Sequence, residues 1–385
     1  MSSADGAGTG AWREGDPVGR RQFADVGTVP LERGDEVPEV RLAYETWGQL
    51  APDGSNAVLV LHALTGDSHV TGPAEPGHPT DGWWEGIVGP GRAIDTDRWF
   101  VVAPNVLGGC QGSTGPASIA PDGRAWGARF PYLTVRDQVE AEARLTDALG
   151  IDTWAAVVGG SMGGMRVLEW AAMYPERVRG IAPIAVGAVA SADQIALQTI
   201  QIQAVRADPA YRGGDYLLDP MAPEPVVGLA LARRLAHWSY RSREELDERF
   251  GRQPQVGEEP LGGGGRFAVQ SYLDHHGGKL VRRFDAASYV VLTDSMNSHD
   301  LGRGRDGVAD ALARYRGEAA VIGIDSDRLY PLDEQHELAR LLAGPGSRAE
   351  VVSSLHGHDS FLIEHDQMGA FLEGLLARVG ATTAP

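Results

Sequence analysis

The sequence predicts an α/β fold: a mostly parallel, doubly wound sheet with a helical lid inserted between two of its strands. Three observations predict this fold. Short apolar runs alternate along the chain with stretches of helical periodicity, which is typical of parallel sheets. A G-x-S-x-G pentapeptide at residues 159–163 stands between one such run and a helical pattern. The stretch from Ser191 to Asp306 breaks the alternation and reads as helices.

The core elements follow in chain order. Alternating apolar and polar residues from Val29 to Trp47 predict an antiparallel hairpin at the start. Short apolar runs predict buried strands, and longer periodic stretches predict helices. The strands are expected at residues 57–62, 99–104, 154–158, 178–185, 319–324 and 349–352, and the helices at residues 135–149, 165–174 and 368–378.

The chain divides into a core and an insertion. Residues 23–190 and 307–380 are predicted to form the α/β core, and residues 191–306 the helical lid. Because both ends of the lid segment lead into sheet strands, an insertion is favoured over an independent second domain. Within the lid, helices are expected at residues 192–205, 225–237 and 242–250, whereas residues 281–291 are ambiguous. Residues 1–22, which are rich in Gly, Ser and Asp, are predicted to be disordered.

The composition narrows the function classes. A hydrophobic content of 43% and a charged content of 22% are typical of globular proteins. The net charge of −18 argues against nucleic acids and anionic membranes as partners, and an anionic cosubstrate would need a local basic funnel. A single cysteine, Cys110, excludes internal disulfides and fits a reducing compartment. With neither a signal peptide nor a membrane span in the sequence, a cytoplasmic location is expected.

The pentapeptide predicts a nucleophile elbow. A buried strand ends, the chain turns sharply through Ser161, and a helix begins. The flanking glycines leave room for a strained turn and for close packing of the strand against the helix. The alternative is an ordinary tight turn in a chain with 51 glycines. The strand before and the helix after favour the catalytic interpretation, with Ser161 as nucleophile.

A base and an acid are expected later in the chain, in the order known for α/β-hydrolase folds. The strand ending at Ile324 is followed by Asp325 and Asp327, and the spacing of Asp327 to a proline four residues later favours Asp327 as the acid. The last strand leads into His356 and His358, and His358, preceded by glycine before the final helix, is favoured as the base. His358 would take the proton of Ser161, and Asp327 would orient the imidazole.

An oxyanion hole needs two N–H donors. The amide after the nucleophile, that of Met162, is predicted as one, and the amide of Leu64, in the loop after the strand at residues 57–62, as the other. The sequence contains no H-E-x-x-H or paired C-x-x-C spacing, so no metal site is predicted, and no P-loop is present.

At this point the chain resembles the homoserine O-acetyltransferases of methionine biosynthesis, an α/β-hydrolase-fold family, from about Arg41 to Leu376. The resemblance rests on HALTGDSH at residues 62–69, NVLGGCQGSTGP at 105–116, GGSMGGM at 159–165 and GHD at 357–359. Lid segments at residues 232–242 and 271–276 are similar too, although His276 and Ala287 depart from the residues more usual in the family.

The resemblance implies a ping-pong reaction in which Ser161 accepts an acetyl group from acetyl-CoA and the hydroxyl of L-homoserine then removes it. It implies that Arg233 holds the homoserine carboxylate, and that Tyr240, Asp359 and Thr65 help to fix the amino acid. Acetyl-CoA would be a cosubstrate, with no bound cofactor. A homodimer formed through the lid is expected by analogy.

Other functions remain open at this stage. The acyl donor could be a succinyl thioester, or the acceptor serine. Water could replace the amino acid, which would make the protein an esterase. A scaffold that kept the fold and lost the chemistry is disfavoured because Ser161, Asp327 and His358 are all present.

Overall fold

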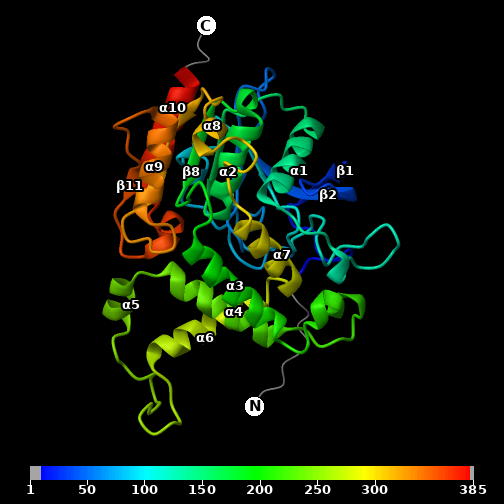
Figure 1. Ribbon diagram of the computed structural model, residues 1–385, viewed down its shortest axis with the longest axis vertical. Helices are drawn as coiled ribbons and strands as arrows, with labels where there is room; N and C mark the ends of the chain where they lie inside the picture. Colours follow the sequence, from blue (N-terminus) through cyan, green and yellow to red (C-terminus); the bar gives the residue numbers. More distant parts are fainter. Residues whose placement is uncertain (1–9, 382–385) are drawn as a thin grey trace.

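Short apolar runs form the sheet at the centre of the molecule. The computed structural model describes residues 10–381 and contains a nine-stranded sheet in the order β1-β2-β6-β3-β7-β8-β10-β11, with β9 beside β8 (Figure 1). The strands are β1 (Gln22–Pro30), β2 (Glu36–Trp47), β3 (Ala57–Leu61), β6 (Phe100–Pro104), β7 (Ala156–Gly160), β8 (Gly180–Ile184), β9 (Glu318–Ala319), β10 (Ile322–Ile324) and β11 (Glu350–Val352). Two short strands, β4 (Val88–Gly89) and β5 (Ile94–Asp95), pair separately.

The strand directions confirm the predicted fold class. The pairs β1–β2 and β2–β6 are antiparallel, which confirms the entry hairpin, and the remaining pairs are parallel. Parallel strands bring their carboxyl ends to one edge of the sheet. The loops after β3, β6 and β7 therefore share that edge, and the predicted nucleophile lies there.

Helices cover both faces of the sheet. Strand β3 alternates between two apolar cores, with Leu59 and Leu61 on one face and Val58 and Val60 on the other. The first core includes α1 (Val135–Ala148), α2 (Met162–Met173) and α9 (Leu332–Ala343), and the second includes α10 (His365–Ala381). The short α8 (Val308–Leu312) leads back into the sheet. Within residues 10–381, every helix is too short or too polar to cross a membrane.

A helical segment connects β8 to the last part of the sheet and lies beside the core (Figure 1). Its helices are α3 (Ala192–Arg206), α4 (Val226–Tyr240), α5 (Arg243–Arg249), α6 (Ala268–Val281) and α7 (Ala286–Asn297). Its entry and exit run side by side, because the Ala190 amide donates to the His299 carbonyl and the Leu301 amide to that of Ala188. This pairing forms a narrow neck. At the entry it lies just before the predicted limit of 191, and at the exit it lies a few residues before the predicted limit of 306.

The region that the sequence left ambiguous, residues 281–291, holds the last residue of α6, a short connection and the first part of α7. Most of α6 lies before that region and was not predicted as a helix. Helix α6 contains Gly277 and Gly278, which lower helix propensity and hide the pattern. A Cβ at Gly277 would lie 3.0 Å from the Ala230 carbonyl oxygen of α4. Close packing between α4 and α6 therefore explains a helix that local propensity alone does not favour.

The predicted disorder of residues 1–22 does not hold for the part that the structure describes. Residues 1–9 lie outside the described range. From residue 10 the chain packs on the core: Ala11 is buried, and the Trp12 amide donates to the Cys110 carbonyl at 2.9 Å. The buried Arg21 donates to the side chain of Gln111 at 2.9 Å. These long-range contacts could not be read from a Gly-rich composition.

Candidate active site

Ser161 stands at a strained turn between β7 and α2. Its backbone has φ 57° and ψ −124°, a conformation that a residue with a side chain rarely adopts. A Cβ at Gly163 would lie 2.1 Å from the Leu61 carbonyl oxygen, and one at Gly159 would lie 2.7 Å from the Gly163 carbonyl carbon. The two glycines therefore let α2 start directly against the end of β3, which is the geometry expected of a nucleophile elbow.

His358 and Asp327 form a buried pair. The Nδ1 of His358 lies 2.6 Å from Oδ2 of Asp327, and the other oxygen of Asp327 accepts from the amides of Leu329 and Tyr330. Because an ionised carboxylate can only accept, Nδ1 carries a hydrogen and Nε2 is left as an acceptor. Nε2 is buried and has no hydrogen-bond partner among residues 10–381. An imidazole held this way can accept a proton.

The charge of Asp327 controls the titration of this histidine. Burial disfavours the imidazolium, but the nearby carboxylate outweighs burial, and the pKa of His358 is raised above its ordinary value. The aromatic rings of Tyr240, Tyr330 and Phe361 surround the imidazole at centroid distances of 5.5, 5.2 and 5.7 Å. They restrict its rotation and exclude water.

The structure separates the two candidate acids and the two candidate bases. Asp325 is exposed and accepts hydrogen bonds from the side chain of Ser353 and the amide of Ser354. His356 is partly exposed, and its Nδ1 lies 3.3 Å from Glu245. Asp327 and His358, which the sequence favoured, are the ones that lie together.

A cavity of about 350 Å³ lies between the core and the lid. Ser161 and His358 line it from the core, together with residues 63–67, while α4 and α6 contribute the lid wall. Ser161 itself is only 5% exposed. The cavity lies within the size range of small-molecule sites.

The cavity brings together the residues assigned to the amino acid by resemblance. Helix α4 extends to Tyr240, so Arg233 and Tyr240 both face the cavity, with the guanidinium 5.5 Å from the ring centroid. Arg233 also lies 3.5 Å from the Thr65 hydroxyl. Asp359 lines the same cavity, where its Oδ2 pairs with Arg241 at 3.1 Å.

Several cavity residues were not identified from the sequence. Arg241, Lys279 and Arg283 add positive charge to the lining, and Arg283 donates to the Thr65 carbonyl at 2.6 Å. The same lining also contains the carboxylates of Asp67, Asp81 and Asp359, so cations and acids share the cavity wall. Tyr330 contacts His358, and its buried hydroxyl interacts with the side chain of Ser161. Arg283 lies in the connection between α6 and α7, within the residues 281–291 that the sequence left ambiguous, which is why its position could not be inferred.

The two predicted oxyanion donors, the amides of Met162 and Leu64, lie on neighbouring elements. Met162 is the first residue of α2, so its amide has no carbonyl one turn earlier in the helix. Leu64 lies in the loop after β3 and lines the cavity with Ser161. A helix N-terminus also carries a partial positive charge, which favours an oxyanion.

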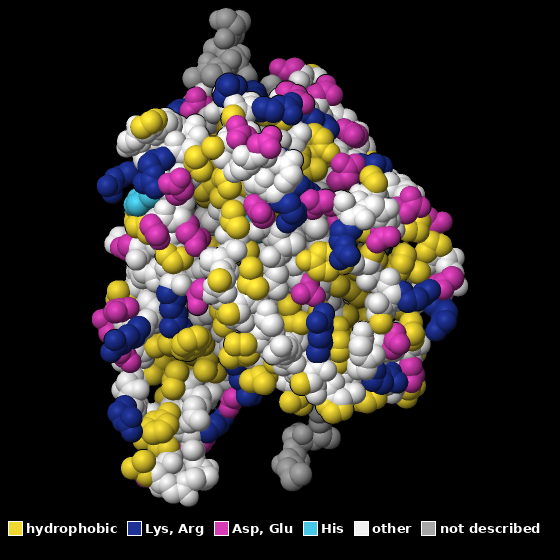
Figure 2. Space-filling model, viewed as in Figure 1, with side chains coloured by type: hydrophobic (Ala, Val, Ile, Leu, Met, Phe, Trp, Pro, Cys, Tyr) yellow, Lys and Arg dark blue, Asp and Glu magenta, His cyan; other side chains and the backbone are white. Residues whose placement is uncertain are grey.

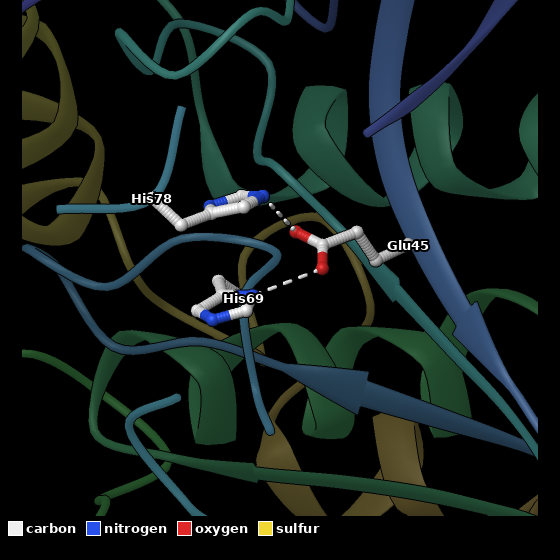
Figure 3. A group of neighbouring side chains, drawn as sticks. All are labelled: Glu45, His69 and His78. Carbon is white, nitrogen blue, oxygen red and sulfur yellow. Dashed lines mark hydrogen bonds and ion pairs between the residues drawn. The ribbon is translucent and has the colours of Figure 1, made fainter. Parts of the chain in front are cut away.

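Glu45, His69 and His78 form a buried cluster behind the cavity wall, with ligand-capable atoms within 4.8 Å of one another (Figure 3). The two rings stack at 4.0 Å with planes 11° apart, so their nitrogen lone pairs do not converge on one point. His69 contacts Glu45 at 3.1 Å through Nδ1 and the Gly72 carbonyl at 3.2 Å through Nε2. Burial opposes protonation of His69, but Glu45 outweighs burial and raises the pKa of His69 above its ordinary value. The contacts of His69 with Glu45 and Gly72 anchor the loop after β3.

Comparison with known proteins identifies the family. The α/β hydrolase fold family matches residues 56–365. The homoserine O-acetyltransferase of Clavibacter michiganensis subsp. michiganensis is 62% identical over 370 residues, which cover 96% of this chain and 95% of that protein. The enzyme of the same name from Thermobifida fusca is 62% identical over 371 residues, covering 96% and 97% of the two chains.

Solved structures agree with these relatives. A homoserine O-acetyltransferase from Bacillus anthracis superimposes with a TM-score of 0.83 at 26% identity, covering 92% of this chain and 97% of that one. Esterase E22 has the same TM-score at 24% identity and covers 92% and 99% of the two chains, which shows the shared fold. With this fold, this triad-like geometry and these close relatives along nearly its whole length, the chain belongs to the homoserine O-acetyltransferase family.

Proposed function

We propose that this protein transfers an acetyl group from acetyl-CoA to the hydroxyl of L-homoserine through an acetyl ester on Ser161. The observation that carries the proposal is the buried, unpartnered Nε2 of His358, on a ring held by Asp327 and lining one cavity with Ser161. The names of the close relatives supply the two substrates. The reaction would belong to methionine biosynthesis.

In the first half-reaction, the Ser161 hydroxyl attacks the thioester carbonyl while Nε2 of His358 takes its proton. The amides of Leu64 and Met162 stabilise the oxyanion. The C–S bond then breaks, and the CoA thiolate leaves with the proton that His358 returns. Acetyl-Ser161 remains in the enzyme.

In the second half-reaction, His358 takes the proton of the homoserine hydroxyl, which attacks the ester carbonyl. The same two amides hold the new oxyanion, and the proton returns to Ser161 as the O-acetyl amino acid leaves. Arg233 can pair with the carboxylate of homoserine through its planar fork. Asp359 can receive the ammonium group, because its contact with Arg241 uses only Oδ2.

We also propose that the protein acts in the cytoplasm, because acetyl-CoA is available there and the reducing conditions suit a single free cysteine. Its net charge of −18 supports the absence of nucleic-acid and membrane partners.

A homodimer is proposed through the lid. Exposed apolar side chains gather over α3 and α4 (Figure 2): Ile195, Ile200, Val226, Val227, Leu231 and Trp238. An exposed cluster of this kind favours an interface.

Incubation with acetyl-CoA alone should place a single acetyl ester on Ser161, because no acceptor is present to remove it. Intact-mass and peptide mass spectrometry would locate the adduct, and Ser161→Ala should lack it while keeping its fold. Sustained release of thiol should then require homoserine. Release without any amino acid would instead support an esterase, and release only with a succinyl donor or with serine would change the substrate.

The rate of Ser161 acetylation should fall as the pH is lowered, with a midpoint above the ordinary histidine pKa of about 6.5. The reason is that His358 must be neutral to accept a proton and Asp327 raises its pKa. Asp327→Asn removes this charge and leaves burial, so the midpoint should move to lower pH and kcat should fall by about 10⁴, as in serine proteases. Asp325→Asn is the matched control and should change neither quantity.

Arg233→Ala should slow the second half-reaction and spare the first, because only homoserine brings the carboxylate that Arg233 pairs with. The loss should be about 2–5 kcal/mol. Arg233→Lys should recover part of it, since an ammonium cannot pair as a fork. Pre-steady-state rates of thiol release and of deacylation separate the two steps. Homoserine amide, which lacks the carboxylate, should be a poor acceptor for the wild type. Its deacylation rate should fall little further in Arg233→Ala. Equal slowing of both steps would contradict this role.

The wild-type protein should sediment with twice the chain mass in analytical ultracentrifugation. Leu231→Lys combined with Val227→Lys should give the monomer, because both residues lie on the exposed face of α4 and a charge there is costly to bury. Met221→Lys is the control: Met221 is 90% exposed but lies outside both helices. A monomeric wild type, or a double variant that stays dimeric, would rule out this interface.

A further inference from the structure

Arg166 is buried behind the nucleophile and connects two elements of the site. It lies on α2, one helical turn after Met162, and is 0% exposed. One end of its guanidinium donates to Glu142 of α1 at 2.5 Å, and the other donates to the backbone carbonyl of His62 at 2.5 Å. Glu142 is also buried and accepts from Trp170 at 2.9 Å. A buried guanidinium must be paired, so these contacts hold it in one position.

His62 begins the loop that carries Leu64. Its Nε2 accepts from the Val106 amide at 3.1 Å, and its Nδ1 lies 2.7 Å from the Ala63 carbonyl. Burial, reinforced by the charge of Arg166, lowers the pKa of His62 to about 3, so the ring stays neutral with the hydrogen on Nδ1. The carbonyls of His62 and Ala63 are therefore both held, and the next amide along the chain is that of Leu64.

We propose that Arg166 is a positioning residue for the oxyanion hole, which fixes the Leu64 loop relative to the start of α2. This inference rests on the proposed function, in which the amides of Leu64 and Met162 stabilise the same oxygen. Those amides belong to different elements, the loop after β3 and helix α2, and Arg166 connects the two on their buried side. At Gly163 the same elements touch backbone to backbone. The contact at Gly163 sets how closely they approach, and Arg166 sets the orientation of the loop.

The guanidinium suits this role better than an ammonium. Its fixed fork serves a carboxylate and a carbonyl in two directions at once. The bond from Arg166 also gives the His62 carbonyl a donor, which this buried acceptor at the end of β3 would otherwise lack. Without Arg166 the loop would keep its ring contacts but lose the connection to α2.

The test measures both half-reactions in Arg166→Met combined with Glu142→Gln, which removes both buried charges and leaves Trp170 an acceptor. Both steps pass through an oxyanion. The rate constants for acetylation and for deacetylation of Ser161, each normalised to the fraction of enzyme that can be acetylated, should therefore fall by about tenfold to a hundredfold. The KM for homoserine should change less than about twofold, because Arg233 is untouched. Arg166→Lys should recover part of the rate. Thermal unfolding and circular dichroism establish that each variant is folded at the assay temperature.

Glu169→Gln is the matched control. Glu169 is a buried residue of the same helix and pairs with Arg136 and Arg305, but neither partner belongs to the loop after β3. It should lower stability and leave both rates unchanged. Full rates in the Arg166 variants, a loss confined to one half-reaction, or an equal loss in Glu169→Gln would overturn the proposal.

A second donor separates this inference from the proposed function. If acetyl-CoA fails to acetylate the wild type, the proposed substrates are wrong. The variants are then compared with p-nitrophenyl acetate, whose reaction with Ser161 needs the same oxyanion hole. A retained difference between the wild type and the Arg166 variants would support the positioning role independently of the natural donor.

Discussion

The direct contact between the start of α2 and the end of β3 is the constraint on which the site depends. It forces Ser161 into a backbone conformation that costs about 1–3 kcal/mol, which the surrounding core must supply. A side chain at Gly159 or Gly163 would push the helix away. The serine hydroxyl, the Met162 amide and the loop after β3 all take their positions from this contact, so the chemistry begins with backbone packing.

The cavity wall carries several cationic side chains, although the chain as a whole is acidic. The net charge is −18, yet the cavity is lined by Arg233, Arg241, Lys279 and Arg283. Arg241 pairs with Asp359 and Arg283 with a backbone carbonyl. The only polar contact of Arg233 among the described residues is a long one to Thr65, so its fork stays available to an incoming carboxylate. Because Arg241 and Arg283 already have partners, Arg233 is the lining guanidinium best placed to receive a carboxylate.

The sequence predicted much of the fold because buried parallel strands are short apolar runs that need no partner to be recognised. Ser161 and His358 could be proposed as site residues because each follows a strand in a known chain order, and Asp327 because of its spacing. Helix α6 was missed, since its glycines serve packing against α4 rather than helix propensity. Arg166 was missed as well: it reads as one more helix residue, and its carbonyl partner lies 104 positions earlier in the chain. Local patterns report backbone state, whereas such contacts exist only after folding.

The single lysine of this chain, Lys279, has a consequence for handling the protein. Apart from 11 histidines, every other basic side chain is an arginine, and arginine resists the acylating reagents that modify amines. Amine-directed dyes, cross-linkers and coupling surfaces therefore have one side-chain target in the whole molecule, and it lines the catalytic cavity. Lys279 is exposed, so coupling through this side chain would attach the protein at the rim of the cavity.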